Sequence, residues 1–406
     1  MHTSILQLIK QEELRQQSTI RLIASENYVS DDIKFALGSN LTNKYSEGYP
    51  HARYYEGQEF IDQIEDIAIE YAKKLFGVEY VNVQAYSGSP ANLAVYFALL
   101  EPGDTVIGMS LDAGGHLTHG HRVNFSGKWF NSHQYSLTPE GEIDYDALEK
   151  MAKELQPKLI VSGLSAYPKQ IDFERIGNIA KSIGAYHLAD IAHISAIVAT
   201  GKHPSPVPHA DVVTMTTHKM LRGPRGALIL TNDKKIHKKI QKAVFPGLQG
   251  GPHNNNIAGI AIALEEALRP EFTDYTEQIL KNAKALGEAM KKRGFDIVAD
   301  TTENHLILVD LRPKNIDGNT LSKALIKVNI ETNMNAIPFD PAPPKSPSGI
   351  RLGTPAITTI GLTEEHMDII ADFIDRTVEA AHDEQKLFQI KSEVIEFISK
   401  FTCNFY

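Results

Sequence analysis

Short apolar runs alternate with amphipathic segments between residues 58 and 268. The runs have the length and bounding turn residues of buried strands: Tyr80–Gln84, Thr105–Met109, Lys158–Ser162, Ala185–Asp190, Asp211–Thr214 and Ala227–Thr231. The segments between them place apolar residues at helical spacing: 58–75, Ala91–Leu100, Asp144–Leu155, Asp172–Ile183 and Asn256–Leu268. This alternation predicts an α/β fold whose mainly parallel mixed sheet is flanked by helices.

Beyond Pro270 the pattern changes to long amphipathic helices at Asp274–Arg293 and Thr363–Asp383, with strand-like runs at Phe295–Val298 and His305–Leu311. The proline-rich residues 338–347 are predicted to form an ordered loop. We expect an N-terminal arm and dimer-contact segment at 1–50, a large domain at 51–270 and a smaller C-terminal α+β domain at 271–406. The amphipathic stretch 5–18 would dock on a partner subunit or fray.

Composition narrows the class of protein. The chain has 406 residues, 42% of them hydrophobic, which is enough for a large core. A net charge of −9 disfavours nucleic-acid binding, and the paired lysines at 234–235 and 238–239 suit the solvated face of a helix. The single cysteine, Cys403, excludes an internal disulfide and favours a reducing compartment. No run resembles a signal peptide or a membrane span, so we expect a soluble, cytoplasmic protein.

The segment Thr214–Gly226 carries one lysine between two predicted strands. Lys219 follows two threonines and a histidine and precedes a Gly-Pro-Arg-Gly turn. A partly buried lysine has a lowered pKa and can form a Schiff base with a carbonyl compound. The alternative is an ordinary loop lysine beside a strand.

The segment Ser87-Gly88-Ser89-Pro90 follows a predicted strand and opens a predicted helix. We expect Ser89 to be the N-cap and Pro90 the first helical residue. Free N–H groups, hydroxyls and the helix dipole there suit a phosphate, although the same residues would also make a merely well-capped helix. The glycine-rich turn Phe245–Pro252 offers a second anion contact.

Asp190 ends a predicted strand, and parallel sheets bind ligands at the carboxyl ends of their strands. An acid there can hold a protonated ring nitrogen, as a pyridoxal cofactor requires, or cap the next helix. His116, His119 and His121 lie in a glycine-flanked run without a carboxylate or thiol at matching spacing, so no metal site is expected. An imidazole that contacts a flat cofactor is the preferred interpretation.

The loop residues 45–50 and 53–57 are too rich in tyrosine, glycine and proline for core elements. They suggest ligand contacts and a general acid or base at Glu47, with a plain surface loop as the alternative. Arg351, between Ile350 and Leu352, suits a bidentate grip on a carboxylate or a surface salt bridge.

Together these motifs resemble the serine hydroxymethyltransferase family over nearly the whole chain. The segments that carry the resemblance are Leu22–Tyr28, Leu41–Pro50, Ser87–Asn92, Gly114–Gly120, Asp190–His193, Thr216–Lys219, Gly223–Gly226, Phe245–Gly247, Gln249–Pro252 and Gly349–Pro355. The resemblance implies the aspartate-aminotransferase fold, which is fold type I of pyridoxal-phosphate-dependent transferases. It also implies active sites shared across a homodimer, with a tetramer as the alternative assembly.

Roles for single residues are likewise implied by the resemblance. Lys219 would carry pyridoxal 5'-phosphate as an internal aldimine, Asp190 would pair with the pyridine nitrogen and His116 would stack on the ring. The remaining cofactor contacts would be Ser87, Gly88, Ser89, Ser165, His193, Thr216 and His218, with Tyr45 and Gly251 from the neighbouring subunit. Substrate and folate contacts would be Ser25 and Arg351 at the amino-acid carboxylate, Glu47, Tyr54 and Tyr55 near the hydroxymethyl group and the folate, and Leu111, Gly115, Leu117 and Asn335 at the pterin.

The implied reaction converts serine and tetrahydrofolate into glycine and 5,10-methylenetetrahydrofolate. A folate-independent pyridoxal-phosphate aldolase for threonine-like β-hydroxy amino acids is the alternative within the enzymes, and a non-catalytic or RNA-binding relative is the alternative outside them. The chain departs from the usual family pattern at Glu56, Ala85, Met220, Ala227 and Met334 and in the loop 341–348. Of these, Glu56 and the loop lie nearest the folate entrance that the resemblance implies.

Overall fold

The computed structural model describes residues 4–401 and divides into two compact units. The larger unit spans residues 29–277, and the smaller one combines the segments before residue 29 and after residue 277. Helix α11 (Pro270–Lys292) contains residues of both. Cys403, the basis of the predicted reducing compartment, lies outside the described residues.

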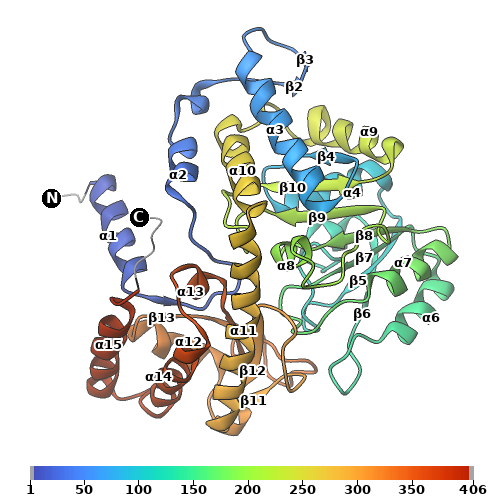
Figure 1. Cartoon of the computed structure of the whole chain (residues 1–406). Helices are drawn as coiled ribbons and strands as arrows, with labels where there is room; N and C mark the ends of the chain where they lie inside the picture. The colour runs from blue at the N-terminus through green and yellow to red at the C-terminus, as the bar shows by residue number, and fades with distance from the viewer. Residues whose placement is uncertain (1–3, 402–406) are drawn as a thin grey trace. The chain divides into compact units, whose positions relative to one another are not determined.

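The described part of the larger unit is built on a seven-stranded sheet (Figure 1). Along the sheet the strands are β4 (Tyr80–Asn82), β10 (Ala227–Thr231), β9 (Val212–Thr216), β8 (Tyr186–Asp190), β7 (Leu159–Gly163), β5 (Thr105–Met109) and β6 (Asn131–Tyr135). Strand β10 is antiparallel to both neighbours and the other pairs are parallel. The predicted mainly parallel mixed sheet is confirmed.

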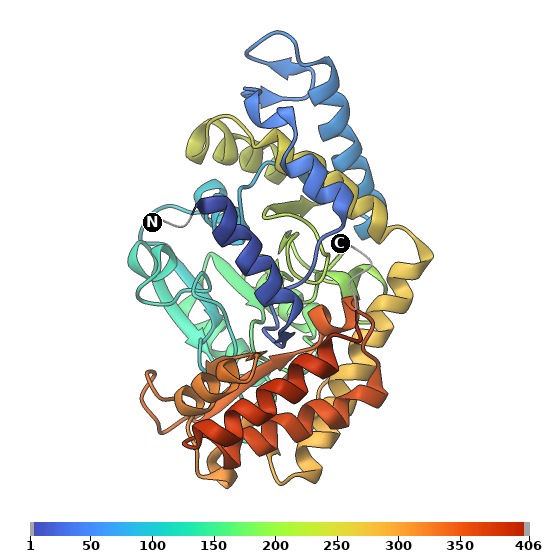
Figure 2. The same cartoon turned by 90° about the vertical axis from the view of Figure 1, so that its left-hand side faces the viewer.

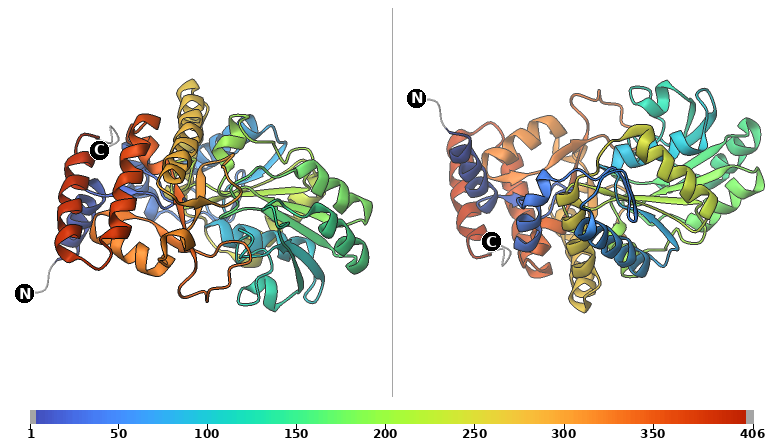
Figure 3. Two further views of the ribbon diagram at one scale, coloured as in Figure 1. Left: turned by 90° about the horizontal axis from the view of Figure 1, so that it is seen from below. Right: turned by 90° about the horizontal axis from the view of Figure 1, so that it is seen from above.

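Every residue of β7, β9 and β10 is buried, as expected for strands covered on both faces. Helices lie on both sides of the sheet (Figure 3). The helices of this unit are α2 (Asp31–Leu37), which contacts α10, and α3 (Glu59–Phe76), α4 (Gly88–Leu99), α5 (Phe125–Lys128), α6 (Tyr145–Leu155), α7 (Phe173–Ser182), α8 (Ser195–Ala199), α9 (Lys234–Lys242) and α10 (Asn254–Ala267). Helix α9 confirms that the paired lysines lie on a helix, whose buried residues are Ile236 and Ile240.

Helix α3 shows where a helical pattern and burial diverge. Gly77 ends it as the C-cap in the left-handed conformation, at a φ of 66° that glycine adopts without strain. Ile61 and Ala68 are buried, whereas Phe60 is 70% exposed and Ile67 is 45% exposed. The apolar stripe of this helix is therefore wider than the face that its own unit covers.

The smaller unit contains a four-stranded antiparallel sheet, in the order β11 (Asp296–Ile297), β12 (Leu306–Asp310), β15 (Gly349–Gly353) and β14 (Asn333–Asn335). A parallel pair joins β1 (Ile20–Arg21) to β13 (Ile330–Glu331). The helices are α1 (Ile5–Gln17), α12 (Gly318–Lys327), α13 (Pro355–Thr359), α14 (Met367–Glu379) and α15 (Glu384–Ile398), together with the last part of α11. Helices α12, α14 and α15 contact one another (Figure 2).

The proline-rich loop of this unit is organised by one side chain. Asp340 accepts hydrogen bonds from the backbone N–H groups of Ile337, Ala342 and Ser348 and from the Ser348 hydroxyl. These bonds fix the loop at both ends, in agreement with the predicted ordered loop. Among the described helices, none has the length and apolar character needed to cross a membrane.

The helix register of α14 generates a matched test. Ile370 is fully buried and its neighbour Ile369 is 41% exposed. Ile370→Ala should lower the free energy of unfolding by about 2–5 kcal/mol because it leaves a cavity, and Ile369→Ala should change it by less than about 0.5 kcal/mol. Equilibrium urea unfolding measures both, and equal losses would contradict the assigned register.

His187 on β8 generates a prediction about pH. Its Nδ1 lies 3.3 Å from the carbonyl oxygen of His209, which only accepts, so Nδ1 carries the hydrogen and Nε2 accepts from Ser162 at 2.8 Å. Burial lowers the pKa of His187 from 6.5 to about 4. Between these pH values the unfolded chain binds a proton that the folded chain does not, so the free energy of unfolding should fall as pH falls from 6.5 to 4.

His187→Gln keeps a hydrogen-bonding side chain that does not titrate. The free energy of unfolding of this variant should therefore fall less steeply as pH falls from 6.5 to 4. The slope should diminish and not vanish, because burial also lowers the pKa of His116 and His218. Denaturant unfolding at a series of pH values provides the comparison, and an unchanged slope in the variant would sink the idea.

Candidate active site

Lys219 lies in a closed loop at the carboxyl end of β9. Residues 217–226 connect β9 to β10, whose register pairs Thr216 with Ala227. Inside the loop, Thr217 N donates to Gly226 O at 3.2 Å and Gly223 N donates to Thr217 O at 2.8 Å. Lys219 is half-buried. The predicted lysine between two strands is confirmed, and these bonds give its backbone a fixed position.

The carboxylate of Asp190 ends β8 and is held by neighbouring elements. Its Oδ2 accepts from Asn92 Nδ2 at 2.8 Å and from His119 Nε2 at 3.2 Å, while Oδ1 accepts from Ala192 N at 3.0 Å. Asn92 also donates to Thr118 Oγ1 at 2.8 Å and accepts from Thr214 Oγ1 at 2.6 Å. Because a carboxylate only accepts, this network fixes which end of the Asn92 amide faces Asp190.

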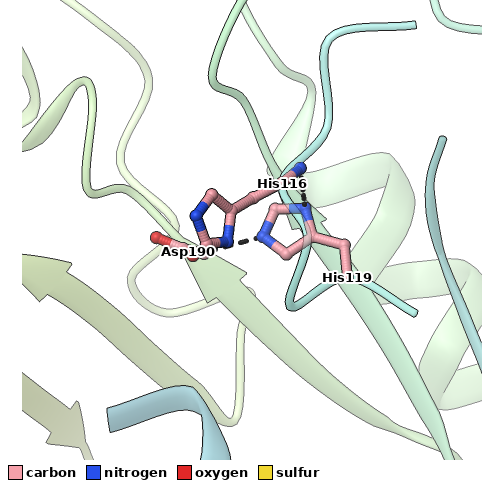
Figure 4. Close-up of side chains that lie close together, drawn as sticks. All are labelled: His116, His119 and Asp190. Atoms are coloured by element: carbon pink, nitrogen blue, oxygen red, sulfur yellow. Dashed lines mark hydrogen bonds and ion pairs between the residues drawn. The ribbon is translucent and has the colours of Figure 1, made fainter. Parts of the chain in front are cut away.

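Figure 4 shows how His119 links the backbone of His116 to Asp190. His116 N donates to His119 Nδ1 at 3.2 Å, so the neutral ring carries its hydrogen on Nε2 and donates it to Asp190. Burial acts to raise the pKa of Asp190, but the hydrogen bonds that Asp190 accepts from His119 and Asn92 act against burial, and the pKa lies well below its ordinary value. Asp190 is therefore a buried acid whose surroundings favour its ionised form.

His116 lies in the same cluster as a neutral imidazole. Thr118 N donates to its Nδ1 at 3.2 Å, which places the ring hydrogen on Nε2. Burial, followed by the proximity of His119, lowers the pKa of His116 to about 4, and the charges of both Asp190 and Lys219 act on it. A neutral ring near an acid, and under the influence of the Lys219 charge, suits contact with a flat, polarised group.

The same cluster also meets the spacing of a metal site. One ligand atom from each of His116, His119 and Asp190 lies within 4.8 Å of the others. The Nε2 hydrogen of His119 already points to Asp190, so metal binding would require its loss. We interpret the cluster as a hydrogen-bonded network, and the predicted lack of a metal stays a prediction.

The start of α4 differs from the prediction. Ser87 is the N-cap and Gly88 the first helical residue, so the prediction of Ser89 as N-cap was wrong. The Ser87 side chain makes no capping hydrogen bond, which leaves its hydroxyl and the first N–H groups available to an anion. A Cβ on Gly88 would lie 2.7 Å from Thr216 Cγ2, so this helix start lies beside the strand that leads to Lys219.

His218 contributes a further donor next to the lysine. Its Nδ1 is buried without a hydrogen-bond partner among the described residues. Burial, then the charges of Arg225 and Lys219, lowers the pKa of His218 to about 4. A buried ring nitrogen without a partner is costly, and an acceptor such as a phosphate oxygen would satisfy it.

Other predicted cofactor and folate contacts lie in the loops that follow β5, β7 and β8. Ser165 follows β7, and its N–H donates to Gly114 O at 2.6 Å, which brings Ser165 to the loop that carries His116. His193 is buried in the turn after β8. Gly115 lies in the same loop as His116, where a Cβ would collide with the carbonyl of Met109. Leu111 is 42% exposed and Leu117 is 40% exposed.

A second group of predicted residues gathers around the hairpin of β2 (Gly48–Tyr49) and β3 (Ala52–Arg53). Tyr55 Oη donates to Glu47 Oε2 at 3.3 Å, and the Glu47 charge raises the pKa of Tyr55. The Tyr45 ring meets Tyr55 edge-on at 5.8 Å, and a Cβ on Gly251 would lie 3.1 Å from it. Tyr54 is 70% exposed and meets Phe245 edge-on at 5.6 Å.

A third group lies in the smaller unit. Arg351 on β15 pairs across the sheet with Asn333, and its Nε donates to Asn333 Oδ1 at 3.1 Å. Burial lowers the pKa of Arg351 to about 10, so the guanidinium stays charged at neutral pH. Ser25 follows Ala24, which packs closely on Gly353. Asn335 on β14 donates its amide to Ala336 O at 2.7 Å.

The sequence interpretation missed the contacts that hold the predicted residues. Asn92 lies in a matched motif but received no role, and Asn333 received none because its link to Arg351 is a cross-strand contact. Ser89, Asn92 and Tyr96 recur at helical spacing, which puts these polar side chains on one side of the helix. This spacing is the one weak signal by which the sequence could have pointed to Asn92. Met220, which had no explanation in the sequence, is fully buried, so packing accounts for an apolar residue there.

Comparisons with known proteins agree over the length of the chain. The family model described as serine hydroxymethyltransferase matches residues 1–374. The serine hydroxymethyltransferase of Acidothermus cellulolyticus is 54% identical over 405 residues, which cover 99% of this chain and 95% of the relative. The serine hydroxymethyltransferase of Desulfotalea psychrophila is 53% identical, over 98% of this chain and 93% of the relative. That of Cupriavidus necator is 52% identical, over 97% of this chain and 94% of the relative. This match confirms the predicted fold type and enzyme class, and the chain belongs to the serine hydroxymethyltransferase family.

Proposed function

We propose that this chain transfers the hydroxymethyl carbon of serine to tetrahydrofolate, reversibly, to give glycine and 5,10-methylenetetrahydrofolate. One observation carries the proposal: a buried acid that accepts hydrogen bonds from Asn92 and His119 lies beside the neutral His116, on whose pKa the charge of Lys219 also acts. An acid in that state stabilises a cationic ring nitrogen, and a nearby lysine can bind an aldehyde covalently.

The residues fit pyridoxal 5'-phosphate. The uncommitted Ser87 hydroxyl, the first N–H groups of α4 and the unpartnered His218 Nδ1 supply donors for a phosphate. Ser87, Gly88, Ser89, Thr216 and His218 would hold that phosphate, and Lys219 the aldehyde carbon. When bound, the cofactor supplies an electron sink for a carbanion on the amino acid.

The remaining residues around the ring would bind and orient it. Asp190 would accept a hydrogen bond from the protonated ring nitrogen and keep that nitrogen cationic, because the pKa of Asp190 lies well below its ordinary value. His116 would lie against the ring as a neutral imidazole, and Ser165 and His193 would complete the walls of the site. Asn92 and His119 orient Asp190 and do not touch the cofactor themselves.

The substrate contacts rest on the two other groups. Arg351 and Ser25 would bind the amino-acid carboxylate, and the hydrogen bond from Arg351 Nε to Asn333 Oδ1 would orient the guanidinium for this contact. Glu47, hydrogen-bonded to Tyr55, would hold or release the proton of the serine hydroxymethyl group. Tyr54 would contact the substrate or the folate, and Leu111, Gly115, Leu117 and Asn335 would bind the pterin.

A homodimer is part of the proposal. Helix α1 has no buried residue, and Ile5, Leu6 and Leu14 expose 76%, 72% and 65% of their surface. Exposed apolar side chains in this number on one helix favour a partner subunit over solvent. In that dimer, Tyr45 and Gly251 would serve the neighbouring site. A cytoplasmic location is part of the same proposal. So is the division into an N-terminal arm at 1–50, a large domain at 51–270 and a small domain at 271–406.

A first experiment separates this function from the folate-independent aldolase. The purified protein should be yellow, and borohydride should fix the cofactor to Lys219, as peptide mass spectrometry would locate. Lys219→Ala should abolish turnover and keep the far-UV circular dichroism spectrum. Serine cleavage should depend on tetrahydrofolate; equal rates without it would favour the aldolase, and a colourless protein without the adduct would overturn both.

A second prediction concerns Asn92. Asn92→Ala removes a donor from the buried Asp190, so kcat/KM should fall by about 10²-fold, the usual effect of losing a preorganised electrostatic contact. The matched control is Asn131→Ala on β6, an exposed residue that should retain full activity. Steady-state kinetics and the pH dependence of bound-cofactor absorbance provide the measurement. Asn92→Ala with unchanged absorbance and kinetics would remove Asn92 from the site.

A further inference from the structure

The guanidinium of Arg53 is buried in the base of the β2–β3 hairpin. Its side chain is 3% exposed, and it contacts two carboxylates of α3: Nε donates to Asp62 Oδ1 at 2.8 Å and Nη2 donates to Glu65 Oε2 at 2.7 Å. Asp62 and Glu65 are three residues apart on the helix, so they present their carboxylates on one side. This pairing with opposite charges offsets the cost of taking the guanidinium out of water.

The third nitrogen of Arg53, Nη1, is hydrogen-bonded to the backbone on either side of Glu47. Nη1 donates to Ser46 O at 3.0 Å and to Gly48 O at 2.9 Å. Glu47 O in turn accepts from Tyr54 N at 3.1 Å. The backbone of Glu47 is therefore fixed on both sides and at its own carbonyl.

Gly48 and Gln84 also help to fix this part of the backbone. Gly48 has a φ of 97°, and a Cβ there would collide with the carbonyl of Ala52, so only glycine lets the hairpin close this tightly. Gln84 Nε2 bridges Gly48 O at 3.0 Å and Glu65 Oε1 at 2.7 Å. The carbonyl of residue 48 is therefore held from β3 and from the segment after β4.

The chemistry of the group requires arginine. Three of its nitrogens point in three fixed directions of one plane, toward Asp62, Glu65 and the pair of carbonyls. A lysine ammonium is a point charge and could pair with the carboxylates but not also span both carbonyls in one plane. The side chain of Glu47 points away from this cluster to Tyr55.

We propose that Arg53 is a positioning residue that fixes the Glu47 carboxylate for proton transfer. The inference rests on the proposed role of Glu47. Arg53 touches neither substrate nor cofactor on this account; it acts only through the backbone that it holds. Without the hydrogen bonds from Arg53 to the carbonyls of Ser46 and Gly48, Glu47 can shift relative to the reacting atoms. A misplacement of about 1 Å lowers the rate by about a hundredfold.

A double-mutant cycle on the holoenzyme tests this. We expect Arg53→Lys to lower kcat for the tetrahydrofolate-dependent reaction by about a hundredfold. Glu47→Gln should lower it as well, and the double variant should be no slower than Glu47→Gln alone, because Arg53 has nothing left to position. The bound-cofactor absorbance and the borohydride adduct at Lys219 should be unchanged in all three.

Lys73→Met is the matched control, because it removes a cation and a single exposed ion pair from the same helix; its kcat should equal that of the parent. Hydrogen exchange supplies a second readout: the Tyr54 amide should exchange faster in Arg53→Lys. If Arg53→Lys does not fold, Glu65→Gln replaces it in the cycle, with a smaller loss that again vanishes in the Glu47→Gln background.

Each outcome decides a different statement. Losses that multiply in the double variant would overturn the positioning role of Arg53 and leave the proposed role of Glu47 intact. Full activity of Glu47→Gln would overturn both. Loss of the cofactor absorbance in Arg53→Lys would show that Arg53 supports the whole fold of the unit and would also reject the proposal.

Discussion

A carboxylate taken out of water stays ionised only when donors replace the water, and Asp190 shows how this fold supplies them. Asn92 comes from the helix after β4, His119 from the loop after β5, and Ala192 from the turn after β8. Each donor depends on the parallel arrangement that brings the carboxyl ends of the strands to one edge. The tautomer of His119 is set in turn by the backbone of His116. The acid and the neutral ring are therefore one hydrogen-bonded assembly, which Asn92 joins to Thr214 on the strand before the lysine loop.

The same logic applies to the other two groups of functional candidates. Glu47 depends on the buried charges of Arg53, Asp62 and Glu65, and Arg351 depends on its cross-strand neighbour Asn333. In each case a polar side chain that is proposed to meet a ligand is oriented by one that is not. Such supporting contacts restrict rotamers and backbone positions, which is what gives a site its fixed geometry.

The local elements were predictable where one physical signal dominated. Strands β5 and β10 begin and end as the apolar runs predict, because their residues are buried on both faces. Strand β6 (Asn131–Tyr135) escaped prediction because it is a polar edge strand that pairs with β5 alone and needs no apolar pattern. The N-cap of α4 was misplaced by two residues because Ser87 and Ser89 are equally good candidates by composition, and only the path of the chain out of β4 decides between them.

The sequence by itself determined the kinds of groups this protein holds: a lysine between strands, an acid at a strand end, hydroxyls at a helix start and an arginine between apolar neighbours. Their identification as family motifs followed from the order of those residues along the chain. What only the tertiary structure decided is how each group is held, because Asn92 and Asp190 are far apart in sequence, as are Gln84 and Gly48. Hydrogen bonds between distant segments leave no periodic pattern in a sequence, since they depend on sheet order and loop path and not on local spacing.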